Sequence, residues 1–195
     1  MDKLEVARRQ LGTALQLYLD DKDSVSVQCL AAGGGEIAEH LAAKHRQRNF
    51  FPIAMETSTL SLAEMRTARN VYWNAFKHFT DCGGQDRDDE RLLASFDDDS
   101  NELMLFVGWF DYMNAAESLP IEVQVFQIWV WAKRPDRLGK GHDSELYGDL
   151  FPAIGSMSRA EQKAALRSRI AWARGQAEVM QDVKTDPRPL DLGPV

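Results

Sequence analysis

The sequence predicts an all-α protein, built as a single helical-bundle-like domain of five to seven helices. Apolar residues recur every three or four positions through most of the chain, as they do along helices. Two Ser-x-x-Glu capping boxes, Ser61–Glu64 and Ser158–Glu161, mark positions where helices begin. Only residues 121–125 alternate as a strand would, and the chain has no second good strand to pair with them. We place the domain at residues 1–182 and expect residues 183–195 to form a flexible tail.

Length and composition are those of an ordinary globular chain. Its 195 residues are 44% hydrophobic and 27% charged, which is enough to bury the core of one domain. The 30 acidic and 23 basic residues give a net charge of -7, which argues against a nucleic-acid or anionic-membrane partner. Cys29 and Cys82 fit neither a metal-binding spacing nor a disulfide framework. The first residues contain no signal-peptide core. We therefore expect a cytoplasmic protein without a cofactor.

The first two helices are expected over residues 2–19 and from residue 24 to about residue 44. Asp23 or Ser24 can cap the second of them. This second helix contains three consecutive glycines, which should cost roughly 2–3 kcal/mol relative to alanine. A break is one explanation and close approach of another element is the other. The many alanines nearby favour close helix packing, with a kink. The close-packing residues are Gly33, Gly34 and Gly35.

A long connection over residues 46–59 leads to the clearest helix of the chain, Ser61–Phe79. The aromatic residues of the connection suggest that it lies on the body of the protein. The helix is apolar on more than one side, so we expect it to be buried.

Four further helical elements and a C-terminal segment complete the chain. Asp99 or Ser100 can cap a helix over residues 101–116. Residues 121–131 fit a strand or a helix, and we favour the helix. Three of the seven prolines lie in the last ten residues, which fits a disordered tail or a strap over the surface. A short helical turn is expected at 143–150 and a last helix at 158–180.

One face of the Ser61–Phe79 helix carries a polar ridge, which is our candidate site. Side chains four positions apart lie nearly above one another on a helix. A histidine beside cationic and amide side chains can bind a phosphate or act as a general acid or base. Alternatively, Asn74 and His78 are core residues that tie helices together by hydrogen bonds. No nucleophile stands at a fixed spacing, so we name no catalytic residue. The candidate site comprises Arg66, Arg69, Asn70, Asn74, Lys77, His78 and Asp81.

Metal ligation is not expected. Glu36 and His40 lie four apart, and several aspartates follow His78. The Glu-x-x-His motif of di-metal bundles is absent from the sequence, and the acidic loop lacks the EF-hand register. A solvated run of charges is the simpler interpretation.

The five tryptophans predict self-association. At helical spacing, such residues belong to a core or a subunit interface more often than to a ligand cavity. On an acidic chain without a membrane span, they suggest an apolar face that a second copy covers. A two-fold dimer is the commonest arrangement.

Several segments resemble an uncharacterised bacterial protein family. Residues 23–37, DSVSVQCLAAGGGEI, resemble the Asp-x-Val-Ser segment that opens its second helix. Residues 74–78, NAFKH, resemble its Asn-Phe-Phe-Lys-His motif, with Ala75 in place of a phenylalanine. NELMLF and LPIEVQVFQIW resemble its two later helices. The resemblance covers residues 10–135. It implies a bacterial cytoplasmic protein, from a family that includes products of mobile gene cassettes, and implies no activity.

A second similarity is to the helical domains called HEPN. Their ribonucleases place an arginine, often followed by a polar residue, four to six residues before a histidine. Arg69-Asn70 begins in the same way, but eight residues separate Arg69 from His78. On a helix, this spacing changes both the distance and the face.

We expect a binding or regulatory protein that acts through self-association, rather than an enzyme. The alternative is a His-dependent hydrolase or ribonuclease of HEPN-like type that uses the ridge from Arg66 to Asp81. This alternative requires a second acid or base beside His78 in an open cleft. The candidates are Asp81, Glu102 and Asp111.

Overall fold

The structure is a computed structural model of residues 1–195, and it describes residues 1–46, 49–55, 59–135 and 144–193. These residues form ten α-helices, one 3-10 turn and two strands of two residues each. Six of the helices have 13 or more residues, which confirms the all-α class and fits the expected number of helices. Within the described ranges, no helix is long and apolar enough to cross a membrane.

The chain divides into two compact units. Unit 1 contains residues 1–116 together with 193–195, and unit 2 contains residues 117–192. Glu117, at the boundary, has a positive φ of 67°. Two compact units can belong to one domain, so the single domain that we expected over residues 1–182 stays a prediction.

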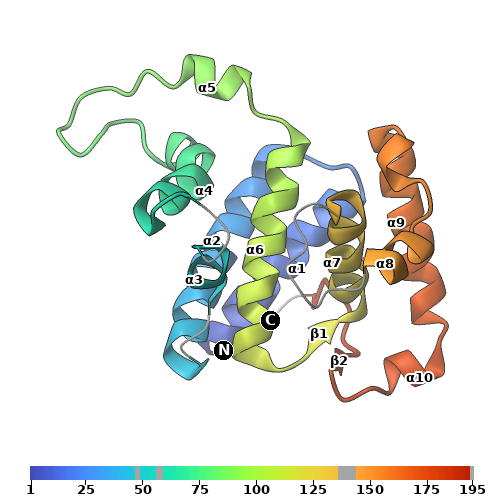
Figure 1. The fold of residues 1–195 in the computed structure, drawn as a ribbon. Helices are drawn as coiled ribbons and strands as arrows, with labels where there is room; N and C mark the ends of the chain where they lie inside the picture. Colours follow the sequence, from blue (N-terminus) through green and yellow to red (C-terminus); the bar gives the residue numbers. More distant parts are fainter. Residues whose placement is uncertain (47–48, 56–58, 136–143, 194–195) are drawn as a thin grey trace. The chain divides into compact units, whose positions relative to one another are not determined.

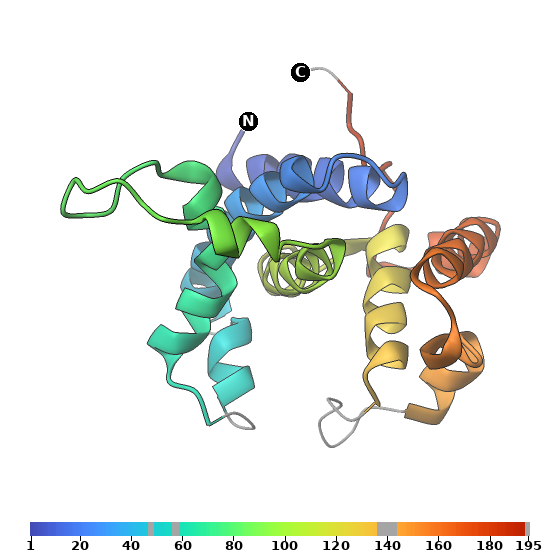
Figure 2. The ribbon, with the colours of Figure 1, turned by 90° about the horizontal axis from the view of Figure 1, so that it is seen from above.

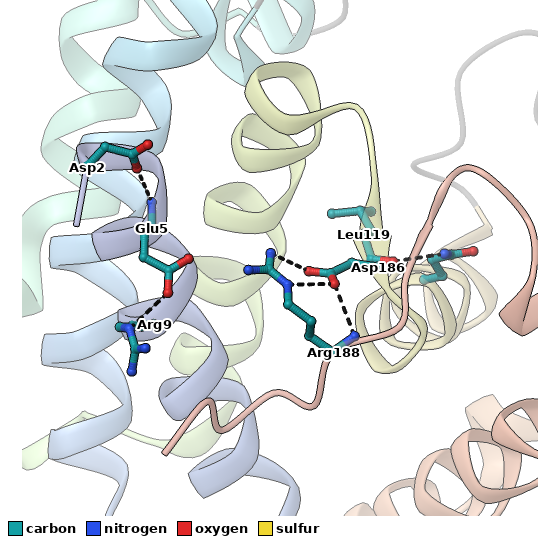
Figure 3. A network of polar contacts seen from close by, with 7 residues as sticks. Asp2, Glu5, Arg9, Leu119, Asp186 and Arg188 are labelled. Carbon is teal, nitrogen blue, oxygen red and sulfur yellow. Dashed lines mark hydrogen bonds and ion pairs between the residues drawn. The ribbon is translucent and has the colours of Figure 1, made fainter. Parts of the chain in front are cut away.

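Three long helices form the core of unit 1. These are α1 (Lys3–Leu19), α2 (Ser24–Arg46) and α6 (Asp98–Ala116), which lie against one another in Figures 1 and 2. The carboxylate of Asp2 caps α1 by accepting the Glu5 N–H at 2.8 Å, and Glu5 accepts a hydrogen bond from Arg9 (Figure 3).

Side-chain carboxylates also fix where the next long helices begin. Asp23 caps α2 by accepting the Ser26 N–H at 2.7 Å, as expected. Asp97 accepts the Ser100 N–H at 3.1 Å, so α6 begins earlier than the cap at Asp99 or Ser100 that we predicted.

Gly34 and Gly35 allow α2 to approach both of its neighbours, in line with the close-packing prediction, whereas a Cβ atom on Gly33 would make only an ordinary contact with the Gln10 side chain. Helix α2 is continuous through the three glycines. A Cβ atom on Gly34 would lie 2.8 Å from Leu11 Cγ and 3.2 Å from the carbonyl oxygen of Ala7 in α1. A Cβ atom on Gly35 would lie 3.3 Å from the Cα atom of Gly108 in α6. The backbones of α2 and α6 therefore meet at Gly35 and Gly108, and a larger residue at either position would push the two helices apart.

We expect Gly34→Leu to destabilise the protein by roughly 1–3 kcal/mol, because the added side chain overpacks the contact with Leu11. Gly148→Leu is the matched control, because a Cβ atom on this exposed helical glycine meets nothing within 4 Å. The control should be neutral or slightly stabilising, since leucine favours helix more than glycine does. Urea denaturation of both variants measures the difference. Equal midpoints for the two variants would refute the packing account.

Helix α4 (Leu62–Lys77) follows the predicted range closely, but it is not buried. Its capping box is complete, because Ser61 accepts the Glu64 N–H and Glu64 accepts the Ser61 N–H. None of its residues is buried, and Phe79 just beyond it is 79% exposed. The expectation of burial was wrong. An apolar pattern on several faces shows that other groups can pack against a helix, but those groups need not belong to the same chain.

Two short helices flank α4. Helix α3 (Phe50–Met55) lies in the long connection, where Phe51 is buried and Phe50 packs edge-on to Phe106 and Phe110. Helix α5 (Glu90–Ala94) lies within the segment of residues 78–97, which projects outward in Figures 1 and 2. The ring of Phe96 anchors that segment between Tyr72 and Phe76 of α4.

Unit 2 consists of helices, with one short strand before the first helix and another after the last. The helical interpretation of residues 121–131 is confirmed by α7 (Ile121–Lys133). Helix α8 (Ser144–Leu150) supplies the expected short turn. The last long helix, α9 (Arg159–Arg174), begins at the predicted capping box but ends at Gly175, earlier than expected. The remaining elements are the 3-10 turn η2 (Ile154–Ser156), α10 (Ala177–Met180), β1 (Leu119–Pro120) and β2 (Thr185–Asp186).

Over residues 185–190, the C-terminal segment forms a strap over the surface, which was one of the two predicted alternatives. Strand β2 pairs in parallel with β1, with Leu119 opposite Thr185. Both carboxylate oxygens of Asp186 accept hydrogen bonds from Arg188 (Figure 3), and Leu190 is 1% exposed. Buried, paired residues therefore hold this proline-rich segment to unit 2.

Candidate functional site

The N-terminal half of the predicted ridge binds a carboxylate that the sequence did not single out. Glu39 of α2 is 3% exposed. Its Oε1 accepts a hydrogen bond from Arg66 Nη2 at 2.5 Å, and its Oε2 accepts one from Arg69 Nη1 at 2.7 Å. Two arginines on successive turns of α4 thus hold one buried acid of α2. This ion-pair cluster attaches α4 to the core of unit 1.

The surroundings of Glu39 determine its charge. Burial alone would raise the pKa of Glu39, but the hydrogen bonds and charges of Arg66 and Arg69 together lower it below its usual value. The ring of Phe51 lies against both guanidinium groups, 4.8 Å from Arg69 Cζ and 6.0 Å from Arg66 Cζ. Asn70 Oδ1 accepts the Arg69 Nε–H at 2.9 Å. The Glu39 carboxylate is therefore ionised and held in a fixed position.

A second buried acid lies close to this cluster. Asp111 of α6 is 0% exposed, and its Oδ1 accepts the backbone N–H of Phe50 at 2.6 Å. Its Oδ2 is buried and has no partner among the described residues. Burial raises the pKa of Asp111, the Phe50 N–H lowers it, the charge of Glu39 raises it and the charge of Arg69 lowers it, and together these effects bring it to about 7. Asp111 can therefore take up or release a proton near neutral pH.

The C-terminal half of the ridge turns away from this cluster. His78 is exposed at the end of α4, where its backbone N–H donates to the carbonyl oxygen of Asn74. Lys77 lies over the ring of Trp73, with Nζ 5.2 Å from its centroid. Asp81 accepts the N–H groups of Gly83 and Gln85 in the following turn. The interpretation of His78 as a buried core residue was wrong, because α4 ends there and the chain leaves the body.

The three acids proposed as partners of His78 lie elsewhere. Asp81 is occupied in its own turn, Glu102 is buried 3.4 Å from the hydroxyl of Tyr18, and Asp111 binds Phe50. In the part of the chain that the structure describes, no hydrogen bond or ion pair joins His78 to any of them. The hydrolase or ribonuclease alternative stays a prediction.

The residues considered for metal ligation do not gather into a site. His40 Nδ1 lies 2.8 Å from the carbonyl oxygen of Glu36, one turn earlier on α2. Across the described ranges, no group of three or more His, Cys, Asp or Glu side chains is arranged to hold a metal ion.

Sequence reasoning found the arginines of the cluster but missed Glu39 and Phe50, and it named Asp111 only as a candidate partner of His78. The sequence does contain a signal that Glu39 and Asp111 are buried and need a partner. Glu39 stands among the alanines of α2, and Asp111 interrupts the apolar run of α6. A lone charge on an apolar helical face must find a partner or change its protonation.

Comparison of the chain with protein-family models, with curated proteins and with solved structures finds no match in any of the three. The two resemblances drawn from sequence motifs therefore stay predictions.

Proposed function

We propose that this chain is a cytoplasmic binding or regulatory protein that acts through self-association, and that α3, α4 and α5 form the contact surface. Free Cys29 and Cys82 fit a reducing compartment. The proposal rests mainly on α4, a 16-residue helix that is apolar on more than one side and yet contains no buried residue.

Five of the eight large apolar side chains that are exposed in the described part of unit 1 occur between residues 53 and 93. In a soluble monomer, such residues are normally scattered singly, and a concentration of them marks an interaction site. We call them the α3–α5 surface, and they lie on α3, on α5 and just before and after α4. Its exposed members are Ile53, Met55, Leu60, Phe79 and Leu93.

A second copy of the chain is the partner that fits this surface. The end of α4 carries the exposed Lys77 and His78, and the projecting segment that follows is acidic, with five carboxylates between residues 81 and 90. A two-fold axis would place the acidic segment of each copy against the basic helix end of the other. An isologous interface needs such a self-complementary surface.

Sedimentation velocity tests this proposal. At tens of micromolar, we expect a mass of about 44 kDa, twice that of one 22.0 kDa chain. Phe79→Ser should weaken association by about tenfold or more, because Phe79 is the most exposed residue of the surface and its ring would be buried on association.

Val183→Ser is the matched control, since Val183 is 92% exposed but belongs to unit 2. This variant should associate like the wild type. A wild-type mass of 22 kDa, or equal effects of the two substitutions, would contradict the proposed surface.

A further inference from the structure

The carboxyl of Asp111 joins α6 to the beginning of α3, and only half of it is hydrogen-bonded. The side chain is fully buried, and its Oδ1 accepts the backbone N–H of Phe50, the first residue of α3, at 2.6 Å. Its Oδ2 is buried too and finds no donor within the described ranges. We propose that the protonation of Asp111 controls how firmly α3 is attached to α6. The helix stays attached while the carboxyl keeps its proton, and it detaches more often once the carboxyl is ionised.

Ionisation of Asp111 is costly as long as α3 is attached. A buried carboxylate needs several donors to replace the water that it loses, and the described residues offer Asp111 a single one. A charged acceptor strengthens the hydrogen bond from Phe50, but one strong hydrogen bond does not replace a hydration shell. The protonated carboxyl carries no charge, so its burial costs far less.

Burial has the largest effect on the pKa of Asp111, and the charges nearby do not reverse it. From α2, the ionised Glu39 opposes a second negative charge, whereas Arg69 of α4 attracts one. Arg69 already donates to Glu39 at 2.7 Å, so its charge is shared between the two acids. Helix α3 has no ionisable side chain, and α1 places Arg8 over the ring of Trp109 on α6. The pKa of Asp111 therefore reaches about 7.

Helix α3 is the element whose movement relieves this cost. Of its six residues, which all belong to the described part of the chain, only Phe51 is buried. The ring of Phe50 packs edge-on against Phe106 and Phe110 of α6. Elements with few buried residues open locally at a lower free energy than the core does. When α3 opens, the Phe50 N–H leaves Asp111 and water takes its place.

The direction of the pH effect follows from the protons bound in each state. With α3 attached, Asp111 keeps its proton up to about pH 7, whereas a solvated aspartate loses it at about pH 4. Between these values the attached state binds more protons than the detached state, so the detached fraction rises with pH. The equilibrium constant for detachment should increase about a hundredfold from pH 5 to pH 8, mostly below pH 7.

Hydrogen exchange of the ¹⁵N-labelled protein, followed by NMR, tests the proposal at the Phe50 amide. This hydrogen exchanges only when its bond to Asp111 breaks. After correction for the pH dependence of exchange itself, the wild type should show the increase of about a hundredfold. Asp111→Asn, which does not titrate, should show none, and Asp149→Asn, the exposed control on α8, should behave like the wild type. A wild-type opening constant that is independent of pH would overturn the proposal, as would an equal increase in Asp111→Asn.

Urea separates the detachment of α3 from the unfolding of unit 1. Low concentrations of urea should hardly change the opening at Phe50, because local detachment exposes little surface. The amides of α1 and α6 should exchange more slowly, and their exchange should increase with urea. Equal rates and equal urea responses would show that α3 opens only together with the core, and would overturn the proposal.

Detachment of α3 does not require self-association, although α3 carries Ile53 and Met55 of the α3–α5 surface. The Phe50 amide should therefore keep its pH dependence in Phe79→Ser, the variant that weakens association. This holds whether the wild type sediments as one chain or as two. Loss of the pH dependence in Phe79→Ser would show that it arises from association and not from Asp111, and would overturn the proposal.

Discussion

Asp111→Asn is expected to raise the free energy of unfolding by about 4 kcal/mol at pH 8 and by only about 1–2 kcal/mol at pH 5. The amide has nearly the shape of the protonated acid, and its oxygen can still accept the Phe50 N–H. It carries no charge to be buried at high pH. The measurement is urea denaturation of the variant and the wild type across this pH range.

The direction of this pH dependence follows from the raised pKa of Asp111. The folded chain keeps a proton on Asp111 up to about pH 7, whereas an unfolded aspartate loses it near pH 4. Between these values the folded state binds more protons than the unfolded state, so the stability contributed by this group falls as the pH rises. Above pH 7 both states have lost the proton and the difference is constant. Asparagine does not titrate, so the advantage of the variant should grow from pH 4 to pH 7.

Asp149→Asn provides the control for net charge, because Asp149 is an exposed carboxylate on α8. Its effect measures what one surface charge contributes on an acidic chain. An Asp111→Asn advantage that stays constant from pH 5 to pH 8 would show that Asp111 is ionised in the folded protein throughout.

Local signals in the sequence were sufficient to predict most of the helices. The capping boxes at Ser61 and Ser158 begin α4 and α9 as predicted. Two of the three glycines of α2, Gly34 and Gly35, lie where another helix approaches closely, as expected of a helix that keeps glycines despite their helical cost. These features depend on residues within a turn or two of each other, or on one backbone contact.

The candidate site could be predicted only in part. The spacing of Arg66 and Arg69 placed both on one side of α4, but their partner Glu39 is 27 positions before Arg66. The periodicity of a sequence predicts which face of a helix a residue occupies, but it does not predict which residue of another helix packs against that face. The same limit explains the error over His78, which lies on the extension of the ridge but beyond the end of the helix. The pairing of charges between helices needs the tertiary structure.

Glu39→Ala is expected to release α4 from α2 while leaving the α1–α2–α6 core folded. Breaking a buried ion pair on one side costs about 3–5 kcal/mol, because the partner left behind keeps its desolvated charge. Here that partner is Arg69, which is 10% exposed. Helix α4 has no buried residue to compensate. Its amides should therefore exchange with solvent at least about a hundredfold faster, while those of α1 and α6 keep their protection.

Glu5→Ala removes the acid of an exposed pair with Arg9 on α1, where both side chains are more than a quarter exposed. Surface pairs of this kind contribute about 0.5 kcal/mol or less, so hydrogen exchange in this control should hardly change. Adding Arg69→Leu to Glu39→Ala should restore part of the lost protection, because it removes the stranded charge. If α4 kept its protection in Glu39→Ala, the contacts with Phe51 of α3 and with Phe96 would be the main attachment, and the ion-pair cluster would contribute little.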